Sequence, residues 1–268
     1  MKKIQLNNCR VCGGKNLKIF LSLGLMPPIN KFPKNKEEAA TEKLFPLETA
    51  FCKDCSHVQL TMALDQEDTF SDYIYFSSNS RTFVEHGRWL AKEMGNRLDL
   101  TKDDLVVEIA SNDGVFLKSF KALPVRVLVV EPAKNIAEVA RNSGIPTDSE
   151  YFGADTAEEI KAKHGHAKLI IGANVLAHAF YLRDFVRGLK LLLKQDGTIL
   201  IEVPYIANLL ENNECDTIYH EHISYFSVFS LQKLFASEGL NLYDVKHLPN
   251  IHGGSLLAIF GHSNGPHK

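Results

Sequence analysis

The 268-residue sequence predicts an α/β fold, in which a mostly parallel sheet carries helices on both faces behind a small cysteine-rich module. Two observations lead to this prediction. From residue 105 onward, short apolar segments alternate with helical segments, as is typical of parallel sheets. Two CxxC pairs precede this region. The expected units are a zinc-binding module at 1–66, a connector and helix at 67–100, and a cofactor-binding α/β domain at 101–268.

The elements follow from apolar spacing in chain order. A helix is expected from about Thr82 to Leu98, because its large apolar residues recur at helical intervals. Strands are expected at 105–110, 125–132, 168–175, 197–204, 241–248 and 255–262. The other helices are expected from 115, at 134–142, at 183–194 and at 230–240, the last with a serine cap and a terminating glycine.

Composition and charge argue against two kinds of partner. A net charge of −2 offers no basic face for RNA or DNA. The sequence has no apolar run of 18 residues, and its "MKKIQLNN" start has no apolar signal-peptide core. We therefore expect a cytoplasmic protein without a nucleic-acid or membrane partner.

Four of the five cysteines are spaced as metal ligands. In a reducing compartment, "CRVC" with Cys9 and Cys12 and "CKDC" with Cys52 and Cys55 indicate a tetrahedral thiolate site for Zn²⁺. Such a site has no open coordination position, so its expected role is structural. The alternative is four buried or redox-active cysteines, and Cys215 is expected to be a free thiol.

The segment after the first strand has the composition of a cofactor loop. In α/β sheets, ligands bind beyond the carboxyl ends of the strands, where "EIASNDG" is expected. It is not the GxGxxG of dinucleotide enzymes. Glu131 ends the second strand, where a carboxylate can accept ribose hydroxyls, and Glu108 and Asp113 add negative charge. This charge suits the sulfonium and ammonium of S-adenosylmethionine better than a pyrophosphate.

Three blocks in order, "CRVCGG…CKDC", "EIASNDG" and "YHEH", resemble the C-methyltransferases that act on nucleotide-linked deoxysugars. The resemblance extends from about Cys9 to Leu256. It implies a class I methyltransferase (Rossmann-like) fold behind a zinc-binding domain. It also implies methylation of a carbon beside a ketone, typically C3 of a thymidine-diphosphate 4-keto sugar.

Carried over to this sequence, the resemblance assigns candidate residues to three sites. The zinc ligands would be Cys9, Cys12, Cys52 and Cys55. The cofactor residues would be Glu108, Ala110, Asn112, Asp113, Gly114, Glu131, Pro132 and Asn174. The substrate and catalytic residues would be His222, Glu221, Tyr219, His178 and Tyr75.

Carbon methylation needs a base and a group that stabilises an enolate. We expect His222 to be the base, because a histidine can accept a proton near neutral pH. Glu221 would orient His222 or the sugar, and Tyr219, Tyr75 and His178 would donate hydrogen bonds. Without the resemblance, "YHEH" is equally consistent with packed core residues. Its HxH spacing is a weaker indication of a metal site.

Two other functions remain open from the sequence. An O- or N-methyltransferase would use the same cofactor loop without an enolate stabiliser. A non-catalytic binding module that retains a zinc site and a methyltransferase fold is the second alternative. The family has a further, C-terminal domain. The segment "HGGSLLAIF" (252–260) resembles the start of that domain, and this sequence ends at Lys268. We expect a monomer. The alternative is that a partner chain supplies the C-terminal domain.

Overall fold

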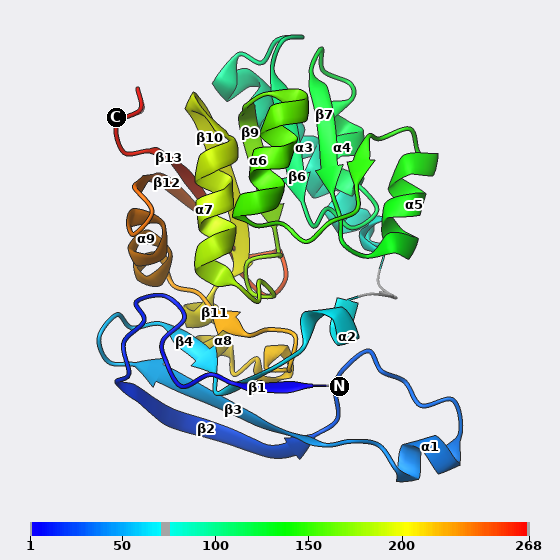
Figure 1. The fold of residues 1–268 in the computed structure, drawn as a ribbon, viewed down its shortest axis with the longest axis vertical. Helices are drawn as coiled ribbons and strands as arrows, with labels where there is room; N and C mark the ends of the chain where they lie inside the picture. The colour runs from blue at the N-terminus through cyan, green and yellow to red at the C-terminus, as the bar shows by residue number, and fades with distance from the viewer. Residues whose placement is uncertain (1, 71–75, 267–268) are drawn as a thin grey trace.

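The computed structural model describes residues 2–70 and 76–266. Its centre is a seven-stranded sheet in the order β12-β13-β10-β9-β6-β7-β8 (Figure 1). The strands are β6 (Leu105–Ile109), β7 (Arg126–Val130), β8 (Thr147–Asp148), β9 (Ala167–Ala173), β10 (Leu193–Pro204), β12 (Leu240–Leu248) and β13 (Ser255–His262). All pairings are parallel except those of β13 with β10 and with β12. The predicted mostly parallel sheet is confirmed.

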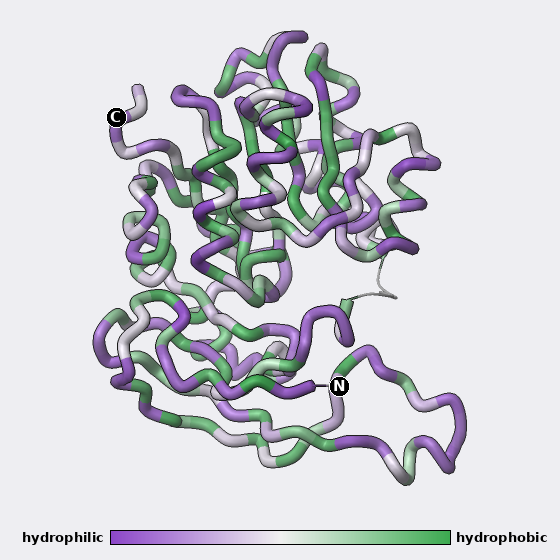
Figure 2. The backbone as a smooth tube through the Cα atoms, viewed as in Figure 1, coloured by the Kyte–Doolittle hydropathy of each residue, from purple (hydrophilic) through white to green (hydrophobic). Residues whose placement is uncertain are grey.

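Helices cover both faces of this sheet, as predicted. One face carries α3 (Arg81–Leu98) and α4 (Val115–Phe120), and the other carries α6 (Ala154–His164), α7 (Leu182–Leu192) and α9 (Val228–Ala236) (Figure 1). Alternate residues of each strand face opposite ways, because side chains alternate along a strand. Val107 packs with the α7 face, whereas its neighbour Val106 packs with the α3 face. Figure 2 shows the resulting apolar character of the central strands.

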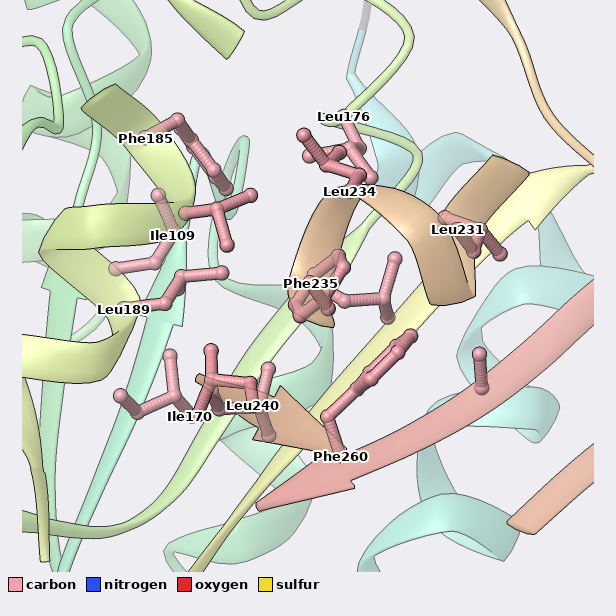
Figure 3. Packing of buried hydrophobic residues seen from close by; sticks show 14 of the residues in the cluster. Ile109, Ile170, Leu176, Phe185, Leu189, Leu231, Leu234, Phe235, Leu240 and Phe260 are labelled. Atoms are coloured by element: carbon pink, nitrogen blue, oxygen red, sulfur yellow. The ribbon is translucent and has the colours of Figure 1, made fainter. Parts of the chain in front are cut away.

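The core between α7, α9 and the sheet is densely aromatic and aliphatic. Phe235 of α9 stacks on Phe260 of β13 with ring centroids 3.7 Å apart. Figure 3 shows Leu189 of α7 pointing toward the same layer. Cys9 and Cys55 belong to this cluster as well. The core of the α/β domain is therefore continuous with the cysteine-rich module.

The N-terminal module is built on a second sheet, in the order β11-β4-β3-β2. Its strands β2 (Leu17–Met26), β3 (Phe45–Cys52) and β4 (Val58–Leu60) belong to the module, but β11 (Ser224–Tyr225) comes from the α/β domain. Ser224 pairs with Gln59 and Tyr225 pairs with Val58. A separate two-stranded sheet joins β1 (Lys3–Gln5) to β5 (Met62–Leu64). The pairing of β11 with β4 therefore crosses the expected boundary between the units 1–66 and 101–268.

Short elements fill the remaining described chain. The helices are α1 (Lys36–Ala40), α2 (Gln66–Phe70), α5 (Lys134–Asn142), α8 (Ile206–Asn212) and the 3₁₀ turns Ser77–Asn79 and Cys215–Thr217. α6 and α8 were not predicted, because they bury too few apolar residues to show a clear period. α9 begins earlier than predicted, because Ser227 and not Ser230 is its cap. No helix within 2–70 and 76–266 has both the length and the apolar character to cross a membrane.

A buried histidine–carboxyl hydrogen bond fastens α3 to the sheet. His86 Nε2 lies 2.6 Å from Glu202 Oε2 of β10, and the Glu202 side chain is fully buried. Trp89, one turn along α3, stacks on the His86 ring with centroids 5.4 Å apart. The N-terminal end of α3 faces the cavity described below, so this pair fixes one of its walls.

We predict that Glu202→Ala lowers the free energy of unfolding by about 1–3 kcal/mol, because it leaves the buried imidazole of His86 without its hydrogen-bond partner. Urea unfolding monitored by circular dichroism measures this change. The control is Asp244→Ala, which removes the exposed ion pair with Arg97 and should cost about 1 kcal/mol or less. Equal losses in the two variants would contradict a special role for the buried pair.

Candidate active site

A cavity of about 710 Å³ lies at the carboxyl ends of β6, β7 and β9. The chain runs from β6 outward to β7 and β8 and then returns to β9 on the other side of β6. This reversal leaves a crevice beyond the strand ends, which is where ligands bind in open α/β sheets. The lining also includes Ile29 and Asn30 of the N-terminal module and Tyr219 and His222 of the "YHEH" segment. Both structural units thus contribute to one cavity.

The turn after β6 has the conformation of a ligand-binding loop. Ala110, Asn112 and Gly114 all have left-handed backbone angles, with φ between 50° and 73°. A non-glycine residue rarely adopts this conformation, and clusters of such residues are typical of functional sites. Ala110 and Asn112 line the cavity. The turn therefore places its backbone at the cavity wall.

Glu131 is positioned after β7 by two backbone donors. Its Oε2 accepts a hydrogen bond from Asn112 N at 2.9 Å, and its Oε1 accepts one from Ala133 N at 2.9 Å. Burial raises the pKa of Glu131 to about 7, although both hydrogen bonds act to lower it. Glu131 and the following Pro132 line the cavity. Each carboxylate oxygen retains a lone pair that can accept a ribose hydroxyl.

Asn174 offers an unused amide at the end of β9. Its backbone N–H donates to Glu202 O at 2.8 Å, and it too has a positive φ, of 56°. Its side-chain oxygen and nitrogen are buried without a hydrogen-bond partner among the described residues. Buried polar groups are normally satisfied, so this amide is available to a ligand. Such a donor and acceptor pair fits S-adenosylmethionine at this position.

The other predicted cofactor residues differ in whether they reach the cavity. Glu108 lines the cavity, and burial raises its pKa well above the usual range. Asp113 and Gly114 do not line the cavity. Asp113 is buried with Lys118 Nζ 4.0 Å away, and a Cβ on Gly114 would lie 2.8 Å from Ile145 Cδ1. These two residues shape the turn without lining the cavity.

Sequence reasoning did not identify the aromatic residues beyond β8. Tyr151 and Phe152 line the cavity on the side of Glu131. β8 has only two residues, Thr147 and Asp148, so no apolar run indicates a strand there. The signal that could have found them is topological, since a third parallel strand must deliver its following loop to the same edge.

In the "YHEH" segment, Tyr219 and His222 form a hydrogen-bonded pair. Tyr219 Oη lies 2.7 Å from His222 Nε2, and His222 Nδ1 lies 2.9 Å from the carbonyl oxygen of Thr217. A carbonyl only accepts hydrogen bonds, so Nδ1 carries the proton of the neutral ring and Nε2 presents its lone pair. Burial lowers the pKa of His222 to about 4. His222 is therefore an unprotonated base at neutral pH.

His178 is the second imidazole of the site. Its ring lies 4.8 Å from that of His222, centroid to centroid, and it lines the same cavity. Burial, followed by the neighbouring His222, lowers its pKa to about 3. The structure thus brings together three of the predicted catalytic side chains, Tyr219, His222 and His178.

The other predicted catalytic residues are placed differently. Glu221 is buried outside the cavity lining, and its Oε1 accepts a hydrogen bond from Asn30 Nδ2 at 3.1 Å. Tyr219 and Thr217, and not Glu221, hold the two ring nitrogens of His222. Tyr75 lies outside the described residues. His252 also lines the cavity.

The four predicted zinc ligands meet at one point. Their sulfur atoms all lie within 4.8 Å of one another, with Cys9 and Cys55 3.5 Å apart and Cys12 and Cys52 3.6 Å apart. Tetrahedral Zn–S bonds of about 2.3 Å place sulfurs roughly 3.8 Å apart, so the site fits Zn²⁺. Among the described residues, this is the one cluster of three or more potential ligands, and Cys215 is exposed elsewhere.

Comparisons with known proteins agree with these two parts. A family model for a methyltransferase domain matches residues 84–245, and a model described as "Putative zinc binding domain" matches residues 9–70. A third model, the NlpE N-terminal domain, matches residues 49–114, which cross from one structural unit into the other.

One curated relative is similar over almost the whole chain. The C-methyltransferase NovU of Streptomyces niveus is 37% identical over 263 residues, which are 98% of this chain. The chain spans 62% of the length of that relative.

Solved structures share the fold at low sequence identity. The magnesium protoporphyrin IX methyltransferase ChlM of Synechocystis PCC 6803, solved with bound SAH, is 13% identical with a TM-score of 0.52, covering 67% of this chain and 83% of its own. The PH0226 protein of Pyrococcus horikoshii OT3 is 12% identical with a TM-score of 0.54, covering 70% and 94%. Because the methyltransferase model matches more than half of the sequence, this chain belongs to the methyltransferase domain family, with a class I fold behind a zinc-binding module.

Proposed function

We propose that this protein is an S-adenosylmethionine-dependent C-methyltransferase that methylates the carbon beside a ketone in a nucleotide-linked keto-deoxysugar, of the thymidine-diphosphate 4-keto type. The observation that carries the proposal is the Tyr219–His222 pair, which presents an unprotonated Nε2 in the same cavity as the cofactor loop. The similarity to a C-methyltransferase over 98% of the chain supports transfer to carbon.

The cofactor would be held at the strand ends. Glu131 would accept the ribose hydroxyls, the amide of Asn174 would take the open hydrogen bonds of the adenosine part, and the backbone after β6 would approach the amino-acid part. When bound, S-adenosylmethionine supplies an electrophilic methyl group on a sulfonium. The acidic side chains of Glu150, Asp155 and Asp184 in the lining would favour this positive charge.

Proton removal would run through the tyrosine–histidine pair. The hydroxyl of Tyr219 already donates to His222 Nε2, so a proton taken from the sugar by Tyr219 Oη can be balanced by transfer of the tyrosine proton to His222. Burial raises the pKa of Tyr219, which disfavours a free phenolate and favours transfer of both protons together. Thr217 O would stabilise the resulting imidazolium through Nδ1.

The neutral imidazole of His178 would stabilise the enolate oxygen. A neutral ring can still donate one N–H, and a positioned donor in a site shielded from water contributes a few kcal/mol to a developing charge. Bound S-adenosylmethionine would supply the methyl group for the enolate carbon held in this way, and no metal is required for this chemistry. The four-cysteine zinc site would act through folding, in the reducing cytoplasm where its thiols remain available.

The charge of the cavity limits how a nucleotide sugar could bind. Among the described lining residues there is no lysine or arginine, whereas five are acidic: Glu108, Glu131, Glu150, Asp155 and Asp184. A diphosphate normally binds to cationic side chains or backbone N–H groups. We therefore propose that the sugar ring enters the cavity while the diphosphate and base remain outside it. The same acidic lining is the observation that favours the alternative, methyl transfer to the nitrogen or oxygen of another small molecule.

We predict that His222→Asn abolishes hydrogen exchange at the carbon beside the ketone. The assay is NMR of a thymidine-diphosphate 4-keto sugar with protein and S-adenosylhomocysteine in D₂O, where exchange should fall by roughly 10²–10⁴-fold on loss of the base. His220→Asn is the control, since His220 packs against Phe45 outside the cavity lining. Exchange that survives His222→Asn would remove His222 as the base, and no exchange by the wild-type protein would favour the alternative function.

The pH dependence should reflect the lowered pKa of His222. We predict that its imidazole signal in NMR titrates near pH 4 and does not change near pH 6.5. Since an unfolded histidine binds its proton below about pH 6.5, the buried neutral His178 and His222 should cost stability as the pH falls from there toward 4. A titration of the His222 signal centred near 6.5 in the folded protein would contradict this.

Cofactor affinity should depend on Glu131. We predict that Glu131→Ala weakens S-adenosylhomocysteine binding by about 10–100-fold, the loss expected for hydrogen bonds to a charged group. Isothermal titration calorimetry measures this. Glu138→Ala, an exposed change on α5, should bind like the wild-type protein. Unchanged affinity in Glu131→Ala would show that the ribose lies elsewhere.

A further inference from the structure

Arg10 stands between two zinc ligands but makes its side-chain contacts in the other structural unit. Its backbone N–H donates to Gln59 Oε1 at 2.8 Å within the module. Its guanidinium reaches across to the α/β domain, where Nη1 donates to Ser224 Oγ at 2.5 Å and Nη2 donates to Phe180 O at 2.6 Å and to Ala179 O. One side chain thus fastens the first zinc knuckle to two segments of the domain.

Both of these segments carry candidate catalytic residues. Ala179 and Phe180 directly follow His178 and themselves line the cavity. Ser224 lies two residues after His222. The guanidinium of an arginine is planar and its N–H groups point in fixed directions, so these three contacts restrict both segments together. Arg10 therefore acts one or two residues away from each imidazole.

Further hydrogen bonds join the same segments to each other and to the module. Ile223 N donates to Ala177 O at 2.9 Å, which ties the "YHEH" segment to the loop of His178. His57 Nε2, in the second knuckle, lies 3.2 Å from Ser224 Oγ. Leu60 N donates to Ile223 O at 3.0 Å. The substrate side of the cavity is therefore attached to the cysteine site and not only to the central sheet.

We propose that Arg10 is a positioning residue, which makes the placement of His178 and His222 depend on the four-cysteine site. The catalytic part of this inference rests on the proposed function, but the positioning does not. With metal bound, the knuckle that carries Arg10 has one geometry, and its guanidinium keeps the carbonyls of Ala179 and Phe180 in place. The cofactor end of the cavity, at Glu131 and Asn112, is held by the central sheet instead.

The second knuckle provides a matched control. Lys53 follows Cys52 in "CKDC" as Arg10 follows Cys9 in "CRVC", so both basic residues are adjacent to a zinc ligand. Lys53 is exposed, whereas the guanidinium of Arg10 is enclosed by its acceptors. The two positions therefore differ in contact with the active-site segments but not in distance along the chain from a ligand.

The experiment compares Arg10→Met with Lys53→Met in the zinc-loaded full chain. Imidazole ¹H–¹⁵N spectra, assigned with His178→Asn and His222→Asn, should show both signals shifted in Arg10→Met and unshifted in Lys53→Met. S-adenosylhomocysteine affinity by calorimetry should stay within about twofold of wild type in both. The turnover number should fall at least about tenfold in Arg10→Met only, since misplaced catalytic groups lose their orientation.

Unshifted His178 and His222 signals in Arg10→Met, or equal shifts in Lys53→Met, would overturn the proposal. Arg10→Lys retains the charge without the fork and should give smaller shifts in the same direction; it also serves if Arg10→Met does not fold. Signals in Arg10→Lys identical to those of wild type would argue against positioning by the fork. Shifted signals in a protein that methylates no keto sugar would uphold the positioning while the proposed function fails.

Discussion

The pairing of β11 with β4 is the constraint on which the site depends. Two residues of the α/β domain, Ser224 and Tyr225, complete the sheet of the N-terminal module. The segment just before them contains Tyr219 and His222. An isolated two-residue strand would not hold its conformation in water, because short strand pairs are marginal without further packing. The module therefore provides the template on which the candidate catalytic segment is ordered. This templating role also explains why a metal site without an open coordination position belongs in this protein.

The two ends of the cavity are held by different parts of the molecule. At the cofactor end, parallel strands deliver Glu131 and Asn174 to the sheet edge, where backbone donors fix the first and burial leaves the amide of the second open. At the other end, the segments of His178 and His222 are fastened to the zinc module. This division suggests that cofactor binding and substrate activation can be disturbed separately. A change in one structural unit would then affect one function first.

Burial determines the protonation states that the proposed chemistry uses. Two imidazoles lie with ring centroids 4.8 Å apart, and desolvation keeps both neutral at pH 7. One neutral ring can accept a proton while the other donates its N–H, so the same environment serves both roles. The cost is stability at acid pH, since both rings would bind protons in the unfolded chain. The acidic cavity lining acts separately, because it favours the binding of a cationic cofactor over that of a diphosphate.

The sequence by itself determined the features that depend on local pattern. Short apolar segments located six of the seven strands of the central sheet, and the CxxC spacing located the metal ligands, because each of these signals lies within a few consecutive residues. It also placed the candidate cofactor turn after β6. Tertiary structure alone decided which partners meet. Tyr219 rather than Glu221 holds His222, Asp113 and Gly114 lie outside the cavity lining, and Arg10 reaches Phe180, 170 residues away. Such contacts join segments distant in the chain, and no local spacing encodes which carbonyl a buried guanidinium will meet.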